Sequence, residues 1–131
     1  MRPRSVASIG ECMIELRHTD PRHLALAYAG DTLNTAVYLK RELGGDGTVH
    51  YVTAVGDDPY SKQMIDGWIA EGIDTSRVLT VGGANCGLYL IQVTPAGERS
   101  FTYYRSQSAA RRLYDTAVPE TGLEDFQIIF L

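Results

Sequence analysis

The residues best suited to binding a small polar ligand gather at two places, and the first is a turn that opens a helix. In Ala29-Gly30-Asp31-Thr32-Leu33-Asn34, a glycine beside the helix start would let a ligand approach the backbone. Free N–H groups at a helix start attract oxygen-rich groups, and Asp31 and Asn34 can hydrogen-bond hydroxyls. The turn fits neither the GxGxxG nor the P-loop pattern, so it carries no nucleotide signature. A structural interpretation stays open, in which Asp31 or Thr32 only caps the helix and Gly30 only turns the chain.

The second place is a predicted hairpin with aromatic and cationic side chains. Residues 86–94 and 99–105 alternate between apolar and polar types, and Pro95-Ala96-Gly97 joins them. Gly97 suits the left-handed position of a three-residue turn. If Thr94 pairs with Glu98, Tyr89 faces Tyr103 across the hairpin, and both lie on one face with Arg105 because strand side chains repeat every second residue.

These three side chains form a chemically coherent set. Tyrosine rings stack well on sugar rings, and the Arg105 guanidinium could hold a carboxylate or a phosphate through two hydrogen bonds. The alternative is that Tyr89 and Tyr103 simply favour strands and that the arginine is solvated.

The remaining candidates are weaker. Glu11 and Glu15, at the end of the first predicted strand, could bind hydroxyls or face water. The three histidines share no metal-like spacing, and the two cysteines, Cys12 and Cys86, fit neither a CxxC motif nor a zinc site, so we expect two buried free thiols. We predict no metal site and no catalytic residue in these 131 residues.

Composition narrows the class of protein. With 44% hydrophobic and 21% charged residues, the chain is typical of one globular domain and unlike disordered, collagen-like or coiled-coil sequences. A net charge of −4 disfavours a nucleic-acid partner. No apolar run approaches the ~20 residues that span a bilayer, and Glu11 and Glu15 interrupt the N-terminal apolar stretch, which argues against a signal peptide. We therefore expect a cytoplasmic protein without a membrane partner.

The elements that must position these residues alternate along the chain. Apolar patterns predict strands over 5–16, 24–28 and 49–55, and helices that begin near Asp31 and at Asp57-Asp58-Pro59. This order predicts an α/β fold. Residues 125–131 form an apolar strand of the buried parallel type, which a crossover helix normally follows. We therefore expect the chain to be part of a larger protein.

Several segments, in order, carry a resemblance to a known family. They are Gly10-Glu11-Cys12-Met13-Ile14-Glu15-Leu16, Gly30-Asp31-Thr32-Leu33-Asn34-Thr35, Val49-His50-Tyr51-Val52-Thr53-Ala54-Val55-Gly56-Asp57-Asp58, Gly87-Leu88-Tyr89, Gly97-Glu98-Arg99 and Tyr103-Tyr104-Arg105. Together they resemble the front part of a ribokinase-type (PfkB) sugar kinase, and within that family the 2-keto-3-deoxygluconate kinases. The resemblance covers essentially all of the chain.

The resemblance implies a ribokinase-like, Rossmann-like three-layer α/β core with a small β-sheet lid. Residues 1–131 would be the N-terminal portion of one sugar-kinase domain, with lid strands near 15–28 and 77–105. It implies a sugar pocket in which one group of residues binds hydroxyls and the lid supplies others toward the keto-acid. The first group is Gly30, Asp31 and Asn34, the second is Tyr89, Tyr103 and Arg105, and Glu15 is a further candidate.

The implied reaction is transfer of the ATP γ-phosphoryl group to 2-keto-3-deoxygluconate, with Mg²⁺ and with a homodimer formed through the lid. The family's usual Gly-Gly is Ala29-Gly30 here, a departure that would narrow the turn. The family's glycine-rich anion hole, its catalytic aspartate and its ATP-binding loops do not occur before Leu131, so this chain alone is expected to be inactive. The alternatives are a fructokinase or another PfkB-type sugar kinase, or a truncated, non-catalytic sugar-binding or dimerisation module.

Overall fold

A parallel sheet lies at the centre of the core. The structure is a computed structural model, and it describes residues 4–115 and 122–131. The strand order of this sheet is β4-β1-β9, with bounds Gly47–Val52, Arg4–Ile9 and Ile128–Phe130. β1 is parallel to both neighbours, so the parallel strand predicted near the end of the chain is confirmed. The prediction that this strand is buried is wrong among the described residues, because β9 pairs only with β1 and its three residues are exposed.

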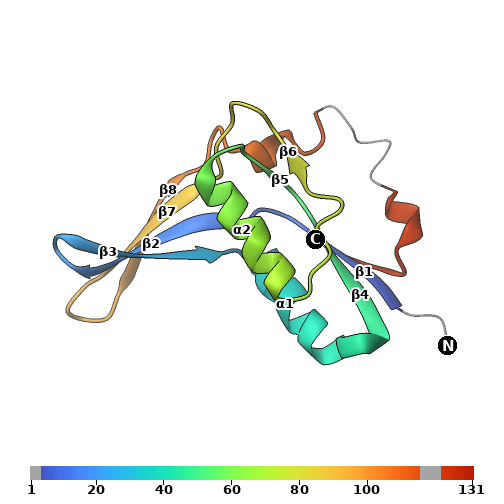
Figure 1. The fold of residues 1–131 in the computed structure, drawn as a ribbon. Helices are drawn as coiled ribbons and strands as arrows, with labels where there is room; N and C mark the ends of the chain where they lie inside the picture. Colours follow the sequence, from blue (N-terminus) through green and yellow to red (C-terminus); the bar gives the residue numbers. More distant parts are fainter. Residues whose placement is uncertain (1–3, 116–121) are drawn as a thin grey trace.

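Two helices cover one face of this sheet (Figure 1). They are α1, Asp31–Leu43, and α2, Pro59–Ala70, and both begin where the sequence predicts. The buried cluster between helices and sheet includes Tyr51, whose ring meets that of Trp68 edge to face at 4.9 Å between centroids. α2 begins as predicted, because Asp58 accepts hydrogen bonds from the backbone N–H groups of its first turn.

The opposite face of the sheet packs on 3₁₀ helices in the described part of the chain. Ala7 and Ile9 of β1 form a second buried cluster with Leu113 and Phe126, which lie beside the 3₁₀ segments Ala109–Arg112 and Leu123–Asp125. A short two-stranded parallel sheet continues the core; it consists of β5, Ala54–Val55, and β6, Leu79–Thr80. None of the helices described here is both long and apolar enough for a transmembrane segment.

A second sheet projects from this core (Figure 1). Its order is β3-β2-β7-β8, with bounds His23–Ala29, Met13–Asp20, Leu88–Val93 and Arg99–Tyr104. The predicted hairpin is confirmed in its register, since Tyr89 pairs with Tyr103, and in its turn, since Gly97 has a φ of 84°. β6 falls within the range 77–105 that was expected to supply the lid, but it pairs with β5 of the core instead.

The single strand predicted over 5–16 is wrong, because the chain leaves the core sheet at Ile9 and enters the second sheet at Met13. The break follows from a close approach at Gly10, where a Cβ atom would lie 2.2 Å from Thr32 Oγ1. The strand predicted over 49–55 likewise divides, at Thr53, into β4 and β5. Glu11 and Cys12 therefore form the passage from one sheet to the other.

The two cysteines are free thiols, as expected. Cys12 is buried against the helices as expected, but the expected burial of Cys86 is wrong, because this thiol, just before β7, is only half-buried. Burial and the neighbouring Cys86 and Glu11 raise the pKa of the Cys12 thiol to about 12. Cys12 is therefore a packing residue at neutral pH.

Candidate functional site

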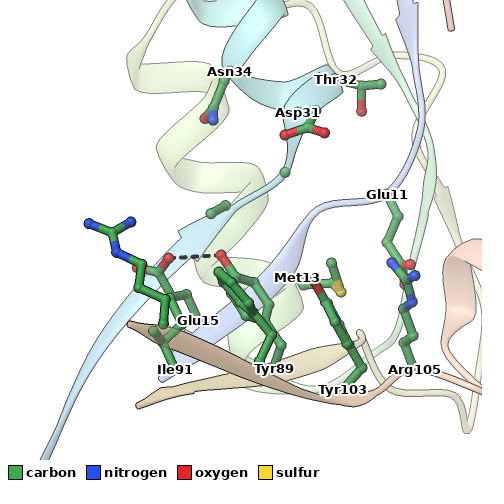
Figure 2. A pocket seen from close by; sticks show the side chains of 14 residues that line it. Glu11, Met13, Glu15, Asp31, Thr32, Asn34, Tyr89, Ile91, Tyr103 and Arg105 are labelled. Carbon is green, nitrogen blue, oxygen red and sulfur yellow. Dashed lines mark hydrogen bonds between the residues drawn. The ribbon is translucent and has the colours of Figure 1, made fainter. Parts of the chain in front are cut away.

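A pocket of about 570 Å³ lies between the second sheet and the start of α1 (Figure 2). One wall comes from the second sheet, and the other comes from the passage at Glu11 and the turn that opens α1. The lining residues are Glu11, Met13, Glu15, Ala29, Gly30, Asp31, Thr32, Asn34, Tyr89, Ile91, Arg99, Phe101, Tyr103 and Arg105. The pocket thus brings together all eight residues that the sequence analysis named as binding candidates, Glu11 included.

The core fixes the start of α1 at the pocket. Ser8 of β1 donates a hydrogen bond to the Thr32 carbonyl at 2.7 Å, and the Thr32 and Tyr51 hydroxyls are 2.9 Å apart. Burial raises the pKa of Tyr51, so this phenol stays protonated. Gly30 approaches the passage so closely that a Cβ atom there would lie 2.4 Å from the Glu11 carbonyl oxygen. A glycine is required at this point by space and not by backbone conformation.

The helix start carries no side-chain cap, which corrects the structural interpretation of Asp31 and Thr32. Gly30 occupies the capping position, and no side chain accepts a hydrogen bond from the first turn. Figure 2 shows Asp31 and Asn34 beside the pocket. Neither side chain has a hydrogen-bond partner among the described residues, so both are available to ligand hydroxyls, as are the N–H groups of the first turn.

The opposite wall gathers the predicted aromatic and cationic groups. The Tyr89 and Tyr103 rings lie 5.7 Å apart between centroids, and the Arg105 guanidinium carbon lies 4.7 Å from the centre of the Tyr103 ring. Arg105 forms no ion pair with the described residues, which leaves its N–H donors free for an anion. The predicted grouping of these three side chains on one face is therefore confirmed.

The two glutamates differ in their surroundings. Glu15 accepts a hydrogen bond of 2.7 Å from the Tyr89 hydroxyl, so this carboxylate does not simply face water. Burial, together with that carboxylate, raises the pKa of Tyr89. Glu11 has one carboxylate oxygen, Oε2, that is buried without a partner among the described residues. It lies close to Gly87, where a Cβ atom would be 2.7 Å from it.

Sequence reasoning missed four lining residues, Met13, Ile91, Arg99 and Phe101. The signal for two of them was present, because Arg99 and Phe101 share the alternating face of β8 with Tyr103. The Phe101 and Tyr103 rings are stacked with centroids 6.3 Å apart. Met13 and Ile91 pack with Tyr89 in a small buried cluster, which gives the tyrosine a firm support.

Metal-ligating side chains do not cluster in the described residues. Across 4–115 and 122–131, no group of three or more His, Cys, Asp or Glu side chains could hold a metal ion. The turn at the start of α1 departs from both nucleotide-binding patterns.

Comparison with known proteins identifies the family. The chain matches the model of the pfkB family carbohydrate kinases over residues 3–131, and it belongs to that family. It is 45% identical to the 2-dehydro-3-deoxygluconokinase of Haemophilus influenzae over 98% of this chain and 42% of that protein. It is 40% identical to the enzyme of that name from Dickeya dadantii, over 100% of this chain and 43% of that protein.

A solved structure confirms the expected ribokinase-like fold class. Fructokinase from Xylella fastidiosa, solved with bound ATP, superposes on 81% of this chain and 32% of its own chain, with 28% identity and a TM-score of 0.71. The chain spans about two-fifths of the length of the curated 2-dehydro-3-deoxygluconokinases it matches.

Proposed function

We propose that the protein containing this chain is an ATP-dependent kinase for 2-dehydro-3-deoxygluconate (2-keto-3-deoxygluconate), and that this chain supplies the sugar pocket and its lid. One observation carries the proposal: a single pocket has free hydroxyl-binding groups on one wall and an unpaired guanidinium beside two tyrosines on the other. A sugar acid has both kinds of partner, hydroxyls and a carboxylate. The names of the two relatives, which are 45% and 40% identical to this chain over the aligned residues, support the same substrate.

The two walls of the pocket bind different groups of the substrate. Asp31, Asn34 and the uncapped start of α1 near Gly30 bind sugar hydroxyls, which selects a polyhydroxylated substrate. Arg105 holds the carboxylate, because a guanidinium matches a carboxylate with two parallel hydrogen bonds. The ring of Tyr103 supports the guanidinium from below and offers an apolar face to the sugar.

The second sheet acts as a lid over the sugar in this proposal. Closure would exclude water, so that a sugar hydroxyl and not water receives the phosphoryl group. A homodimer through the lid is part of the proposal, and the exposed Leu24 and Leu26 support it, since they lie on the edge strand β3 with 42% and 48% of their surface accessible. The proposed location is the cytoplasm.

ATP and Mg²⁺ would be bound by parts of the protein outside residues 1–131. The support is that the described residues hold neither a metal-binding group nor a nucleotide-binding pattern. When bound, ATP supplies the transferred phosphoryl group and Mg²⁺ neutralises its charge. The residues of this chain bind and orient the sugar acid and limit the access of water.

The proposal is tested by an ADP-release assay on the protein expressed from its complete reading frame, read from the coding DNA beyond the codon for Leu131. We expect a higher kcat/KM with 2-dehydro-3-deoxygluconate than with fructose or ribose. A higher kcat/KM with fructose would instead make the protein a fructokinase, the activity named for the solved relative. The 131-residue chain alone, assayed beside it, should release no ADP, and a binding-only role is indicated if the complete protein also releases none.

A further inference from the structure

The hydroxyl proton of Tyr89 is already in a hydrogen bond within the protein when the pocket is empty. Tyr89 Oη donates to Glu15 Oε1 at 2.7 Å, and Figure 2 shows this bond between neighbouring strands. Glu15 on β2 and Tyr89 on β7 are direct partners in the parallel register. A phenol has one O–H donor, whereas an ionised carboxylate can only accept. With its proton on Glu15, Tyr89 offers the pocket only the lone pairs of its oxygen.

The surroundings of Tyr89 stabilise its hydrogen bond to Glu15. Only 9% of Tyr89 is exposed, and it packs with Met13 and Ile91, which holds the ring beside Glu15. Hydrogen bonds to a carboxylate are shorter and about twice as strong as those between neutral groups. The raised pKa of Tyr89 keeps the phenol protonated, so the donor in this pair is not lost at neutral pH.

Arg105, in contrast to Tyr89, has hydrogen-bond donors that are free to bind a ligand. Its guanidinium has only donors, lies over the Tyr103 ring and forms no ion pair with a described carboxylate. The wall formed by the second sheet therefore has an acceptor end at Tyr89, with the negative charge of Glu15 behind it, and a donor end at Arg105. An oxygen with no proton to donate cannot hydrogen-bond a carboxylate, whereas the donors of Arg105 can.

We propose that Glu15 is a positioning residue that determines specificity: it fixes Tyr89 as the acceptor for a sugar hydroxyl and leaves the substrate carboxylate to Arg105. The inference rests on the proposed function and deepens it. Tyr89 then serves any sugar that carries the matching hydroxyl, whether acidic or neutral, whereas Arg105 separates sugar acids from neutral sugars. Glu15 acts through Tyr89 and does not itself contact the substrate.

The hydrogen bond can be tested without a substrate, by ¹H NMR on the protein from the complete reading frame. We expect a slowly exchanging, downfield hydroxyl resonance that disappears in Tyr89→Phe and in Glu15→Ala. Arg17→Ala is the matched control, because Arg17 lies two residues further on the same strand, and it should retain the resonance. A resonance that survives Glu15→Ala would overturn the proposal, because Glu15 would then not hold the proton.

The direction of the substrate contact is tested by kinetics with 2-dehydro-3-deoxygluconate and with the neutral ketose fructose. Tyr89→Phe should lower kcat/KM for both by about five- to tenfold, the loss expected for one neutral hydrogen bond. In the Tyr89→Phe background, the additional change Glu15→Ala should alter kcat/KM for the neutral ketose by less than twofold. If Tyr89→Phe lowers kcat/KM for the sugar acid alone, Tyr89 donates to the carboxylate and the inference is wrong.

The two proposals fail in different ways. Failure of the wild-type protein to phosphorylate the sugar acid overturns the proposed function and, with it, this assignment of the substrate groups. Normal sugar-acid kinase activity, with a Tyr89→Phe loss confined to the acid, overturns only the role of Glu15.

Discussion

Replacing Gly30 by alanine tests whether the close approach of α1 to the passage builds the pocket. The added Cβ would lie 2.4 Å from the Glu11 carbonyl oxygen and 3.3 Å from Cys12 Cα, and both are backbone atoms that cannot rotate away. Ordinary contacts begin near 3.4 Å, so the helix start must move by about 1 Å. Overpacking of this kind costs roughly 1–3 kcal/mol of unfolding free energy.

Urea unfolding of the Gly30→Ala variant, followed by circular dichroism, measures that cost. Because Gly30 and Glu11 both line the pocket, sugar affinity should fall as well, by about tenfold or more if a hydrogen bond to a sugar hydroxyl is lost. Gly67→Ala on α2 is the control, because nothing lies within 4 Å of its added Cβ, and a helical alanine is favoured over glycine by roughly 0.5–1 kcal/mol. A Gly30→Ala variant as stable as the wild type, with unchanged sugar binding, would refute the packing argument.

Three further predictions concern separate parts of the molecule. Asn34→Ala should lower kcat/KM for 2-dehydro-3-deoxygluconate and fructose alike, by about five- to tenfold, whereas a loss confined to one sugar would contradict its role in hydroxyl binding. Asp58→Ala should cost about 0.5–2 kcal/mol in urea unfolding through the lost cap of α2. Burial raises the pKa of Asp58, but the hydrogen bonds from the first turn of α2 outweigh burial and hold this pKa below 3.8. Its contribution to stability is therefore present at neutral pH and lost as the pH falls below that value, and the variant should show a flatter acid profile. With a thiol reagent at neutral pH, Cys86 should react first, and Cys12 should react only on unfolding; equal rates in the native protein would contradict the burial of Cys12.

Local patterns were sufficient to predict the hairpin and the helices. Alternation over residues 86–105 and the single turn glycine determine the register that pairs Tyr89 with Tyr103, because a shift by one residue would turn every side chain to the other face. The Asp58-Pro59 sequence marks the start of α2 because it supplies a cap and a first residue that needs no N–H partner. These signals act within a few residues.

The features that the sequence did not reveal depend on contacts between distant segments. The break after Ile9 depends on the packing of Gly10 against Thr32, which lies 22 residues further along the chain. The bond between Glu15 and Tyr89 joins residues 74 positions apart, and it exists because β2 and β7 lie side by side in parallel. The position of the α1 start likewise depends on distant residues, because Ser8 donates a hydrogen bond to the Thr32 carbonyl and the Tyr51 hydroxyl bonds the Thr32 hydroxyl.

The central claim is that this pocket binds a sugar acid through Arg105, and calorimetric titration of the protein from its complete reading frame tests it most directly. Wild-type protein should bind 2-dehydro-3-deoxygluconate saturably and more tightly than fructose. Arg105→Ala should weaken binding of the acid by roughly tenfold or more, as expected for a charged hydrogen-bonded pair, and leave fructose affinity unchanged. Arg111→Ala, an exposed arginine outside this pocket, should change neither. Equal losses for both sugars in Arg105→Ala, or equal wild-type affinity for both, would contradict the account.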